Sequence, residues 1–317
     1  MNDLAQTSSG LSATNALFDQ PWWLDVVAPE AWGAAEIRRG GTLVARLPYV
    51  TGKRMGFRGL DMPPLTQSLG PWLAPFDGKY AHRLARQKEL MTALIEQLPP
   101  HYYFHQRFHY SISNWLPFYW RGFEQTTRYT YVIESLEDLD RVWSEFQPNI
   151  RREIRKAQKK VAVRTDLGVE RFLDVNALTF GRQRLELPYS KSVVRRLDAA
   201  CAERRARRMF FAEDAQGQIH AALYIVWDES SAYYLMSGGD PNLRTSGATS
   251  LLVWEAIRFA ATVTKKFDFE GSVIEPIERF FRAFGGTQRT YFRVTRLSRP
   301  LRFLMGASEM GKALLGR

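Results

Sequence analysis

The sequence predicts an α/β protein of the α+β kind, made of two tandem units in which a mostly antiparallel mixed sheet is flanked by helices. Three observations support this. The length of 317 residues corresponds to two domains at about 150 residues per domain. Segments with strand-like alternation and segments with helical spacing follow one another along the whole chain. A short stretch from the middle of the chain also recurs near its end.

The first half of the chain alternates helices with strands. Alternating residues around Gly40-Gly41 predict strands joined by tight turns, and leucines at helical spacing predict a long helix that ends at Pro99-Pro100. The expected elements are a helix over 18–27, strands within 36–58, a helix over 80–98, and strands over 101–110 and 126–134.

The second half follows the same pattern and predicts a largely antiparallel sheet that becomes parallel near its end. The expected helices cover 136–146, 149–160, 169–182, 190–205, 246–263 and 276–284. The expected strands cover 161–164, 209–213, 219–227, 232–237, 267–270 and 289–297.

An internal repeat supports the division into two units. Residues 121–128 match residues 282–289 at a constant offset of 161, with four identities in eight positions. An aromatic helical segment precedes each copy and a strand follows it, so we interpret the chain as two copies of one unit. The expected organisation is a disordered tail over 1–14, units over 15–134 and 135–298, and a C-terminal helix over 299–317.

The composition is that of a globular protein with excess positive charge. Hydrophobic residues make up 45% and charged residues 24%, and 44 Lys+Arg against 33 Asp+Glu give a net charge of +11. This excess predicts an anionic partner, which could be a phosphorylated cofactor or substrate, a nucleic acid or an anionic membrane surface.

Several classes of protein are excluded. The single Cys201 excludes a disulfide framework and a cysteine-based metal site, and it fits a reducing compartment. The N-terminus lacks a signal-peptide pattern, and the apolar stretch over 251–263 is too short and too charged to span a membrane. We expect a cytoplasmic protein. Its segment 299–317 could lie on the inner face of the membrane, although a docked helix is favoured.

A loop and helix start in the second half suit a phosphate group. The strand over 232–237 runs into a Gly/Pro/Asn loop, and a helix begins at Ser246-Gly-Ala-Thr249. The first turn of a helix offers free N–H groups, and Arg244 can add a charge-assisted hydrogen bond. The alternative is that Ser246 only caps the helix and Gly238-Gly239 only forms a turn.

This stretch resembles a known family. Arg244-x-x-Gly247-x-Thr249 is similar to the pyrophosphate loop of the GNAT acyltransferase superfamily, Arg/Gln-x-x-Gly-x-Gly/Ala, which cradles coenzyme A. The resemblance implies that acyl-CoA, such as acetyl-CoA, is the donor. It also implies that the donor-binding residues are Met236, Ser237, Arg244, Ser246, Gly247, Ala248 and Thr249.

Two further blocks resemble the Fem-type branch of that superfamily, which includes peptidoglycan-bridge aminoacyltransferases and acetyltransferase-like proteins of polysaccharide clusters. Residues 266–272 followed by 277–286 are similar to its Asp-Phe-x-Gly … Phe-Lys/Arg-x-Phe-Gly end, and residues 149–157 are similar to its arginine-rich helix. The resemblance covers roughly 145–297. It implies two GNAT-like units packed face to face.

Candidate catalytic residues lie near the end of the strand over 267–270. Asp268 and Glu270 fall on one face of this strand, and two neighbouring carboxylates raise one pKa toward the range of a base for an amine. The alternative is that these carboxylates pair with Arg279 or Arg282. The resemblance implies an amide near Met236–Ser237 as donor to the acyl oxygen. Tyr233 and Tyr234 point to opposite faces, and Tyr234 is favoured as the proton donor.

Positive charge gathers on the helix over 150–164 and on 195–208. The helix has one apolar stripe and a basic face, from which Arg151 and Arg155 are expected to contact substrate. The alternative is a solvated basic face. The functional interpretation is a surface for phosphates, either of a tRNA acceptor end or of a nucleotide- or lipid-linked sugar, although no aromatic residues alternate with the charges.

An aromatic segment in the first unit is a candidate wall for the acceptor. His101, His105 and His109 are four residues apart, and on a strand this spacing of about 13 Å is too long for one metal ion. We therefore expect no metal. Neighbouring polar and aromatic residues are expected to bind the acceptor between the two units, or else to belong to the core: Gln106, Asn114 and Trp115.

These patterns predict an N-acyltransferase that transfers an acyl group from acyl-CoA to an amine on a cell-envelope precursor or amino sugar, with no DNA partner. Motifs of serine hydrolases, P-loop enzymes and dinucleotide enzymes are absent from the sequence. One alternative is a Fem-type transferase that uses aminoacyl-tRNA. The other is a non-catalytic protein of the same fold that binds anions or RNA.

Overall fold

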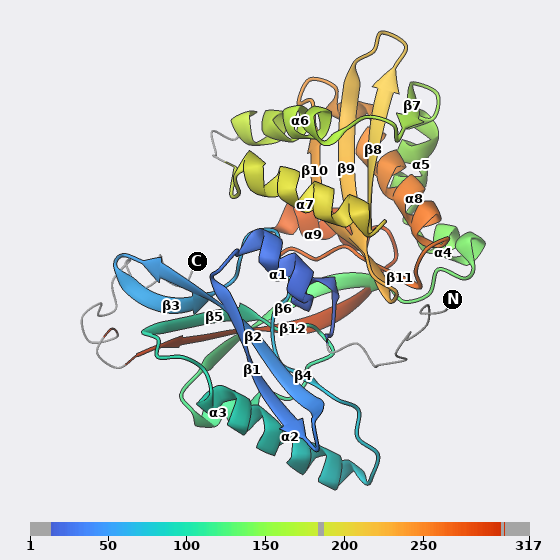
Figure 1. Cartoon of the computed structure of the whole chain (residues 1–317). Helices are drawn as coiled ribbons and strands as arrows, with labels where there is room; N and C mark the ends of the chain where they lie inside the picture. Colours follow the sequence, from blue (N-terminus) through green and yellow to red (C-terminus); the bar gives the residue numbers. More distant parts are fainter. Residues whose placement is uncertain (1–13, 183–186, 299–300, 302–317) are drawn as a thin grey trace, which may run out of the picture.

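The strands of the chain form one continuous mixed sheet (Figure 1). The computed structural model describes residues 14–182, 187–298 and 301. Across these residues the sheet has twelve strands, in the order β1-β2-β3-β5-β12-β6-β11-β10-β9-β8-β7, with β4 paired to β2. Within that described part, no helix is long and apolar enough to cross a membrane.

The first unit places one long helix and one short helix against its part of the sheet, in the lower half of Figure 1. Its elements are β1 (Trp32–Arg39), β2 (Thr42–Arg54), β3 (Phe57–Asp61), β4 (Trp72–Leu73), α2 (Tyr80–Glu96), β5 (Tyr103–Arg107), α3 (Leu116–Trp120) and β6 (Glu124–Ile133).

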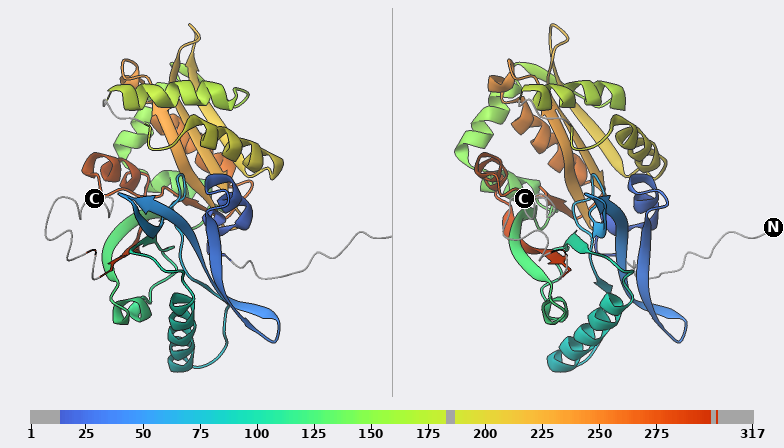
Figure 2. Two further views of the ribbon diagram at one scale, coloured as in Figure 1. Left: turned by 60° about the vertical axis from the view of Figure 1, so that its left-hand side comes forward. Right: turned by 90° about the vertical axis from the view of Figure 1, so that its left-hand side faces the viewer.

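The second unit has helices on both faces of its strands, and two views in Figure 2 show these two layers. Its elements are α4 (Leu139–Glu145), α5 (Pro148–Ala157), β7 (Val161–Arg164), α6 (Val169–Arg182), α7 (Lys191–Glu203), β8 (Arg207–Asp214), β9 (Ile219–Trp227), β10 (Ser231–Gly239), η2 (Arg244–Ser246), α8 (Ala248–Ala260), β11 (Lys266–Asp268), α9 (Glu275–Arg282) and β12 (Thr287–Leu297).

The start of the described chain covers a face of the second unit. The segment η1 (Leu17–Asp19) and the helix α1 (Pro21–Val27) precede β1, and α1 packs against α7. Phe18 meets the ring of Tyr233 edge-on, with 4.9 Å between the centroids. The N-terminal segment therefore shares a core with the strands β8–β10 and the helices α6 and α7.

The two units exchange strands, so the face-to-face packing expected from the family resemblance is not what the structure shows. β6 belongs by sequence to the first unit but pairs with β11 of the second, and β12 from the end of the second pairs with β5 of the first. β6 and β12 also pair with each other. The two units are therefore joined edge to edge within one sheet.

The repeat found in the sequence is also a repeat of contacts. The amide of Phe108, just after β5, donates to the carbonyl of Phe292. At the same offset of 161, the amide of Phe269, just after β11, donates to the carbonyl of Tyr131. The series β3, α2, β5, α3, β6 has the same order as β10, α8, β11, α9, β12, and both β3–β5 and β10–β11 are parallel pairs. The chain thus consists of two tandem α/β units.

Most expected elements are present with boundaries shifted by a few residues, and those over 161–164, 169–182 and 219–227 match the observed bounds. The sequence analysis missed β4, which is only two residues long, and it identified the five-residue α3 only as the aromatic helical segment before the first copy of the repeat. The helix expected over 299–317 lies, apart from the buried Leu301, outside the described residues. The division into units over 15–134 and 135–298 stays a prediction.

Candidate functional site

The pairing of two parallel strands of the second unit ends where the candidate residues gather. β10 pairs with β11 over Ser231–Tyr233 and Lys266–Asp268, and then continues beyond this pairing. Its register against β9 shifts between Tyr234 and Met236, so Leu235 forms a bulge. A bulge bends a strand and increases its twist. The carboxyl ends of parallel strands that diverge are a common ligand position in mixed sheets.

The loop that follows β10 borders a cavity of about 200 Å³. Arg244 and Thr249 are exposed on its wall, and Ser237 lies at its β10 side. Within the described chain, the guanidinium of Arg244 has no hydrogen bond or ion pair. An exposed cation beside the first turn of α8 fits the pyrophosphate of an acyl-CoA, because both supply favourable charge to an anion.

Gly247 holds this loop against a neighbouring helix. Its φ of +81° is in the left-handed region, and a Cβ at this position would lie 2.4 Å from the carbonyl oxygen of Glu153 on α5. Ser246 and Ala248 on either side are buried, and the Ser246 hydroxyl accepts a hydrogen bond from the Ala248 amide at 3.3 Å. Only glycine permits this approach of α8 to α5.

The helix α6 fixes the end of β10. Asn176 donates through Nδ2 to the carbonyl of Ser237 at 2.7 Å, and the amide of Gly239 donates to the hydroxyl of Thr179 at 3.0 Å. A Cβ on Gly238 would lie 2.5 Å from the Asn176 backbone. Asn176 and Thr179 carry no motif, so the sequence analysis missed them. Of the residues that the family resemblance implies, Ser237, Arg244 and Thr249 line the cavity of about 200 Å³, whereas Met236 is buried on β10 and does not line it. Their role in binding the donor stays a prediction.

The two candidate carboxyl groups share a small cavity of about 30 Å³. Asp268 is 5% exposed and accepts hydrogen bonds from the Thr130 hydroxyl and from the Glu270 amide, both on Oδ1. Glu270 lies beyond the end of β11 with a φ of 58°, which a non-glycine residue rarely adopts. Other lining residues come from both units: Phe18, Gln67, Ser68, Phe108, His109, Tyr110, Tyr233 and Tyr291.

Burial dominates the ionisation of both carboxyl groups. It raises the pKa of Asp268 to about 6, against the hydrogen bonds from Thr130 and Glu270 that lower it. Burial also raises the pKa of Glu270 well above its usual range, and the charge of Asp268 adds to this. The sequence argument relied on repulsion between the two groups, whereas the structure adds desolvation as the larger cause.

The arginines that could have neutralised these carboxylates have other partners. Arg279 pairs with Glu275 at 2.5 Å, and Arg282 pairs with Glu278 at 2.9 Å, within α9. In the part of the chain that the structure describes, Oε1 of Glu270 is buried without a hydrogen-bond partner. A buried oxygen without a partner is costly, so a protonated Glu270 or a bound ligand would satisfy it.

The two tyrosines at the end of the β10–β11 pairing take opposite faces. Tyr233 lines the cavity with Asp268 and donates to Asp228 at 3.2 Å. Tyr234 packs edge-on against Phe281 on the other face, with 5.2 Å between the ring centroids. The structure therefore brings Tyr233, and not the favoured Tyr234, to the carboxyl groups.

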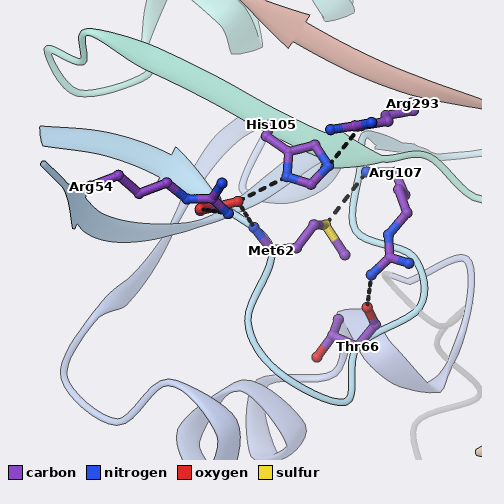
Figure 3. A network of polar contacts seen from close by, with 7 residues as sticks. Arg54, Met62, Thr66, His105, Arg107 and Arg293 are labelled. Atoms are coloured by element: carbon purple, nitrogen blue, oxygen red, sulfur yellow. Dashed lines mark hydrogen bonds and ion pairs between the residues drawn. The ribbon is translucent and has the colours of Figure 1, made fainter. Parts of the chain in front are cut away.

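In the first unit, the pair β3–β5 corresponds to the pair β10–β11. A polar network fills the space at the end of the β3–β5 pairing (Figure 3). His105 Nδ1 bonds Asp61 at 2.9 Å and its Nε2 accepts from Arg293 at 3.2 Å. The loop after β3 also returns to the sheet, because the Leu69 amide donates to the Arg107 carbonyl at 2.7 Å. The side chains of this network and the loop after β3 therefore fill the space at the end of the β3–β5 pairing.

The remaining candidate residues lie in three other places. Gln106 is fully buried and donates to the Pro48 carbonyl, so it cannot form the wall of an acceptor site. Asn114 and Trp115 line a separate large cavity of the first unit. Arg151 and Arg155 gather around Trp143: Arg151 donates to its carbonyl at 3.5 Å, and the Arg155 guanidinium lies 5.7 Å from its ring centroid.

The three histidines over 101–109 have separate partners. Nδ1 of His101 bonds the Pro99 carbonyl, His105 bonds Asp61, and His109 bonds the Ser111 hydroxyl. No group of metal-ligating side chains large enough to hold an ion occurs among residues 14–182, 187–298 and 301.

Comparisons with known proteins identify a domain and the fold. Residues 144–273 match the family model described as "Acetyltransferase (GNAT) domain". A search of curated proteins gave no match. The crystal structure of FemX is similar with a TM-score of 0.66 and 14% identity, covering 91% of this chain and 94% of that one.

Two further solved structures share the arrangement. L-PGS from Bacillus licheniformis has a TM-score of 0.52 and 11% identity, covering 90% of each chain. A tandem GNAT protein from the clavulanic acid biosynthesis pathway has a TM-score of 0.50 and 13% identity, covering 85% of this chain and 84% of that one. At these identities the likeness concerns the fold. The protein is therefore an acyltransferase: its residues 144–273 match a GNAT acetyltransferase domain, and the fold of the whole chain is similar to those of FemX and of the tandem GNAT protein.

Proposed function

We propose that this protein is an N-acyltransferase that transfers an acyl group from acyl-CoA to an amine on a cell-envelope precursor or amino sugar. The observation that carries the proposal is the buried Asp268, with its pKa of about 6, at the end of β11, where the pairing of β10 with β11 stops. A carboxylate with this pKa is ionised at neutral pH and can take a proton from an attacking amine.

The donor would bind at the β10–α8 junction. Arg244 and the amides at the start of α8 would hold the pyrophosphate, and Thr249 lies within reach on the wall of the same cavity. When bound, acyl-CoA supplies an activated thioester. The Met236–Ser237 segment, beyond the bulge in β10, would donate a backbone amide to the acyl oxygen.

Asp268 would act as the base. Its two hydrogen bonds both end on Oδ1, and Oδ2 accepts no hydrogen bond from the described residues. As the amine nitrogen forms its bond to the acyl carbon, Oδ2 would receive the amine proton, and the carbon–sulfur bond would break with release of a thiol. Burial raises the pKa of Glu270 well above its usual range, which favours its protonated form.

The leaving sulfur needs a proton, and a tyrosine can supply it. Burial raises the pKa of Tyr234 to about 12, so its phenol is protonated, and it bonds the Ser237 side chain beside the proposed acyl position. Tyr234 would act only if the thioester lies between the separated strands, because the side chain points away from Asp268.

A direct transfer fits the available nucleophiles. Cys201 is buried, and burial raises the pKa of its thiol to about 12. A thiol in that state is a poor nucleophile. The amine would therefore attack the thioester itself within a complex of both substrates.

The decisive measurement is thiol release from acetyl-CoA with glucosamine and with a lysine-containing peptide as acceptors. Wild type should release CoA, and Asp268→Asn should lose this activity while it still binds acetyl-CoA in calorimetry. Arg244→Glu should lose the binding. The exposed Asp174 on α6 offers a matched control, and Asp174→Asn should behave as wild type. Retained activity in Asp268→Asn would reject the assignment of the base.

The basic face of α5 favours a second candidate, transfer from aminoacyl-tRNA. Arg152, Lys159 and Lys160 are exposed at and beyond this helix, which contacts η2 in the donor loop. If the phosphates of a tRNA bound to this face, its aminoacyl end could reach the same β10–α8 junction. If charged tRNA shifts the melting temperature and acetyl-CoA does not, this second function replaces the first.

A further inference from the structure

The first unit has a large cavity of its own, separate from the carboxyl groups. It has a volume of about 760 Å³ and lies between α2, the loop after β4 and residues 113–116. Phe292 of β12 lines it, whereas its neighbour Tyr291 lines the cavity of Asp268. Successive residues of a strand point to opposite faces, so the sheet separates the two cavities.

The wall of this cavity carries excess positive charge. Three cations of α2, Arg83, Arg86 and Lys88, face a single carboxylate, Asp77. Arg86 lies 4.2 Å from the ring centroid of Phe76 and Lys88 lies 5.4 Å from that of Trp120. None of the three forms an ion pair with any described residue, so their charge is available to a ligand.

The acidic residues of the same helix do not compensate for these cations. Glu89 pairs with Arg39 at 2.6 Å, and Glu96 pairs with Arg121 at 2.6 Å. The carboxylates of α2 are thus engaged with arginines of β1 and of the segment after α3, outside the cavity wall.

Flat side chains and one unpaired donor complete the wall. Tyr80 is 71% exposed and Phe76 is 41% exposed at the cavity, and Trp115 lies on its other side. Nδ2 of Asn114 is buried and has no hydrogen-bond partner within the described chain. A smaller cavity of about 230 Å³ adjoins this one and shares Asn114. Exposed rings stack on flat ring systems, and a buried amide without a partner fits a polar ligand.

We propose that this cavity is a second binding site, for a nucleotide. The cations of α2 would bind its phosphates, Tyr80 or Phe76 would stack on its base, and the Asn114 amide would donate to a ring or sugar oxygen. A volume of about 760 Å³ is typical of a small-molecule site. This proposal does not rest on the acyl-transfer reaction. In the first unit, the network around His105 and Asp61 fills the place where the second unit would bind a thioester.

Calorimetry on the full chain tests the site, with ADP, UDP, CoA and inorganic pyrophosphate as probes. Wild type should bind at least one nucleotide. Arg83→Glu and Arg86→Glu should each weaken that binding about tenfold or more, because each removes a charge-assisted contact. Lys191→Glu is the matched control: this exposed cation begins α7, away from the cavity, and its change should leave binding intact.

Two comparisons identify the ligand and the site. Binding of UDP but not ADP would point to a sugar nucleotide, and binding of ADP and CoA would point to a coenzyme. Tyr80→Ala should weaken nucleotides but not pyrophosphate. In Arg244→Glu, the binding that depends on Arg83 should persist, which separates this site from the donor loop. The proposal fails if no nucleotide binds at millimolar concentration, if pyrophosphate binds as well as the nucleotides, or if Arg83→Glu and Arg86→Glu leave nucleotide binding unchanged.

Discussion

Tyr129 on β6 pairs directly with Thr290 on β12. These two residues are 290 − 129 = 161 positions apart, which is the offset of the internal repeat, so each is the counterpart of the other. A residue that pairs with its own counterpart marks a local twofold axis. The pseudo-symmetry axis of the two units therefore passes between Tyr129 and Thr290.

This axis explains why the exchanged strands make the units interdependent. Each unit completes its sheet with a strand from the other, because β12 pairs with β5 and β6 pairs with β11. The small cavity of Asp268 lies beside this axis, and both units contribute residues to it. The carboxyl groups consequently depend on the integrity of both halves.

The first prediction concerns cooperative unfolding. Val294 on β12 is fully buried in the core of the first unit, and Val294→Ala should destabilise the protein by about 1–3 kcal/mol. Because the strand joins both units, urea unfolding should stay a single transition, and acetyl-CoA binding should be lost at the same denaturant concentration as the fluorescence change. Val163→Ala on the edge strand β7 is the control and should cost less. Separate transitions for binding and fluorescence would contradict the interdependence.

The second prediction concerns the two carboxyl groups. Asp268→Asn should lower kcat by about 10²–10⁴, the usual contribution of a general base. Glu270→Gln should lower it much less, since burial raises the pKa of Glu270 and favours the protonated form, which glutamine resembles. The rate of wild type should rise with pH through about 6 as Asp268 ionises. A larger loss in Glu270→Gln than in Asp268→Asn would exchange the two roles.

The third prediction concerns stability and a buried carboxyl group that the proposed reaction does not use. Burial raises the pKa of Asp19 from 3.8 to about 7, although the Asn15 amide and the charge of Arg46 lower it. The folded state therefore holds a proton that the unfolded state releases between about pH 4 and 7. Stability from this group is present below pH 4 and is lost as the pH rises to about 7, by at most about 4 kcal/mol.

Asp19→Asn removes that ionisation and tests the argument. Its stability relative to wild type should increase with pH between 4 and 7 and then level off. Urea unfolding at pH 5 and pH 8 measures the difference. Asp25→Asn on α1 is the control, because it also removes a carboxylate from this segment. An Asp19→Asn effect that does not depend on pH would show that the raised pKa is not the cause.

The fourth prediction separates the neighbouring tyrosines. Tyr234→Phe should lower kcat with little change in stability if its phenol gives a proton to the leaving sulfur. Tyr233→Phe should mainly lower stability, because Tyr233 is buried and its hydroxyl satisfies Asp228. Steady-state kinetics and thermal unfolding of both variants distinguish the roles. A loss of kcat confined to Tyr233→Phe would transfer the proton-donor role to the tyrosine beside Asp268.

The fold was predictable where it depends on local pattern. The apolar run over 219–227 and the helical spacing over 169–182 locate β9 and α6 to the residue. The pairing of β12 with β5 was not predictable in this way. The two strands are far apart in the sequence, and their local patterns do not identify which strand each one pairs with. The short α3 contains a proline and three aromatic residues, so it has no helical period, and only the internal repeat indicated a helical segment there.

The same distinction holds at the site. The residues over 244–249 form a contiguous motif, and Asp268 and Glu270 are two residues apart, so their grouping could be inferred. Gln106 could not be placed, because the inward face of β5 is set by its pairing with distant β12. The cations of α2 carry no motif, and only the fold places them on the wall of a cavity.

The last prediction concerns the glycine at the donor loop. Gly247→Ala should destabilise the protein and abolish acetyl-CoA binding, because the new Cβ would meet the Glu153 carbonyl at 2.4 Å and φ is +81°. Gly217→Ala is a matched control: its φ is +76°, but a Cβ there meets no atom within 4 Å. The backbone penalty of about 1 kcal/mol is common to both variants. The additional loss in Gly247→Ala, measured by urea unfolding, then reports the contact of α8 with α5. Equal stability of the two variants would mean that α5 shifts to accommodate the new Cβ at little cost. The close contact of α8 with α5 would then not explain the glycine at this position.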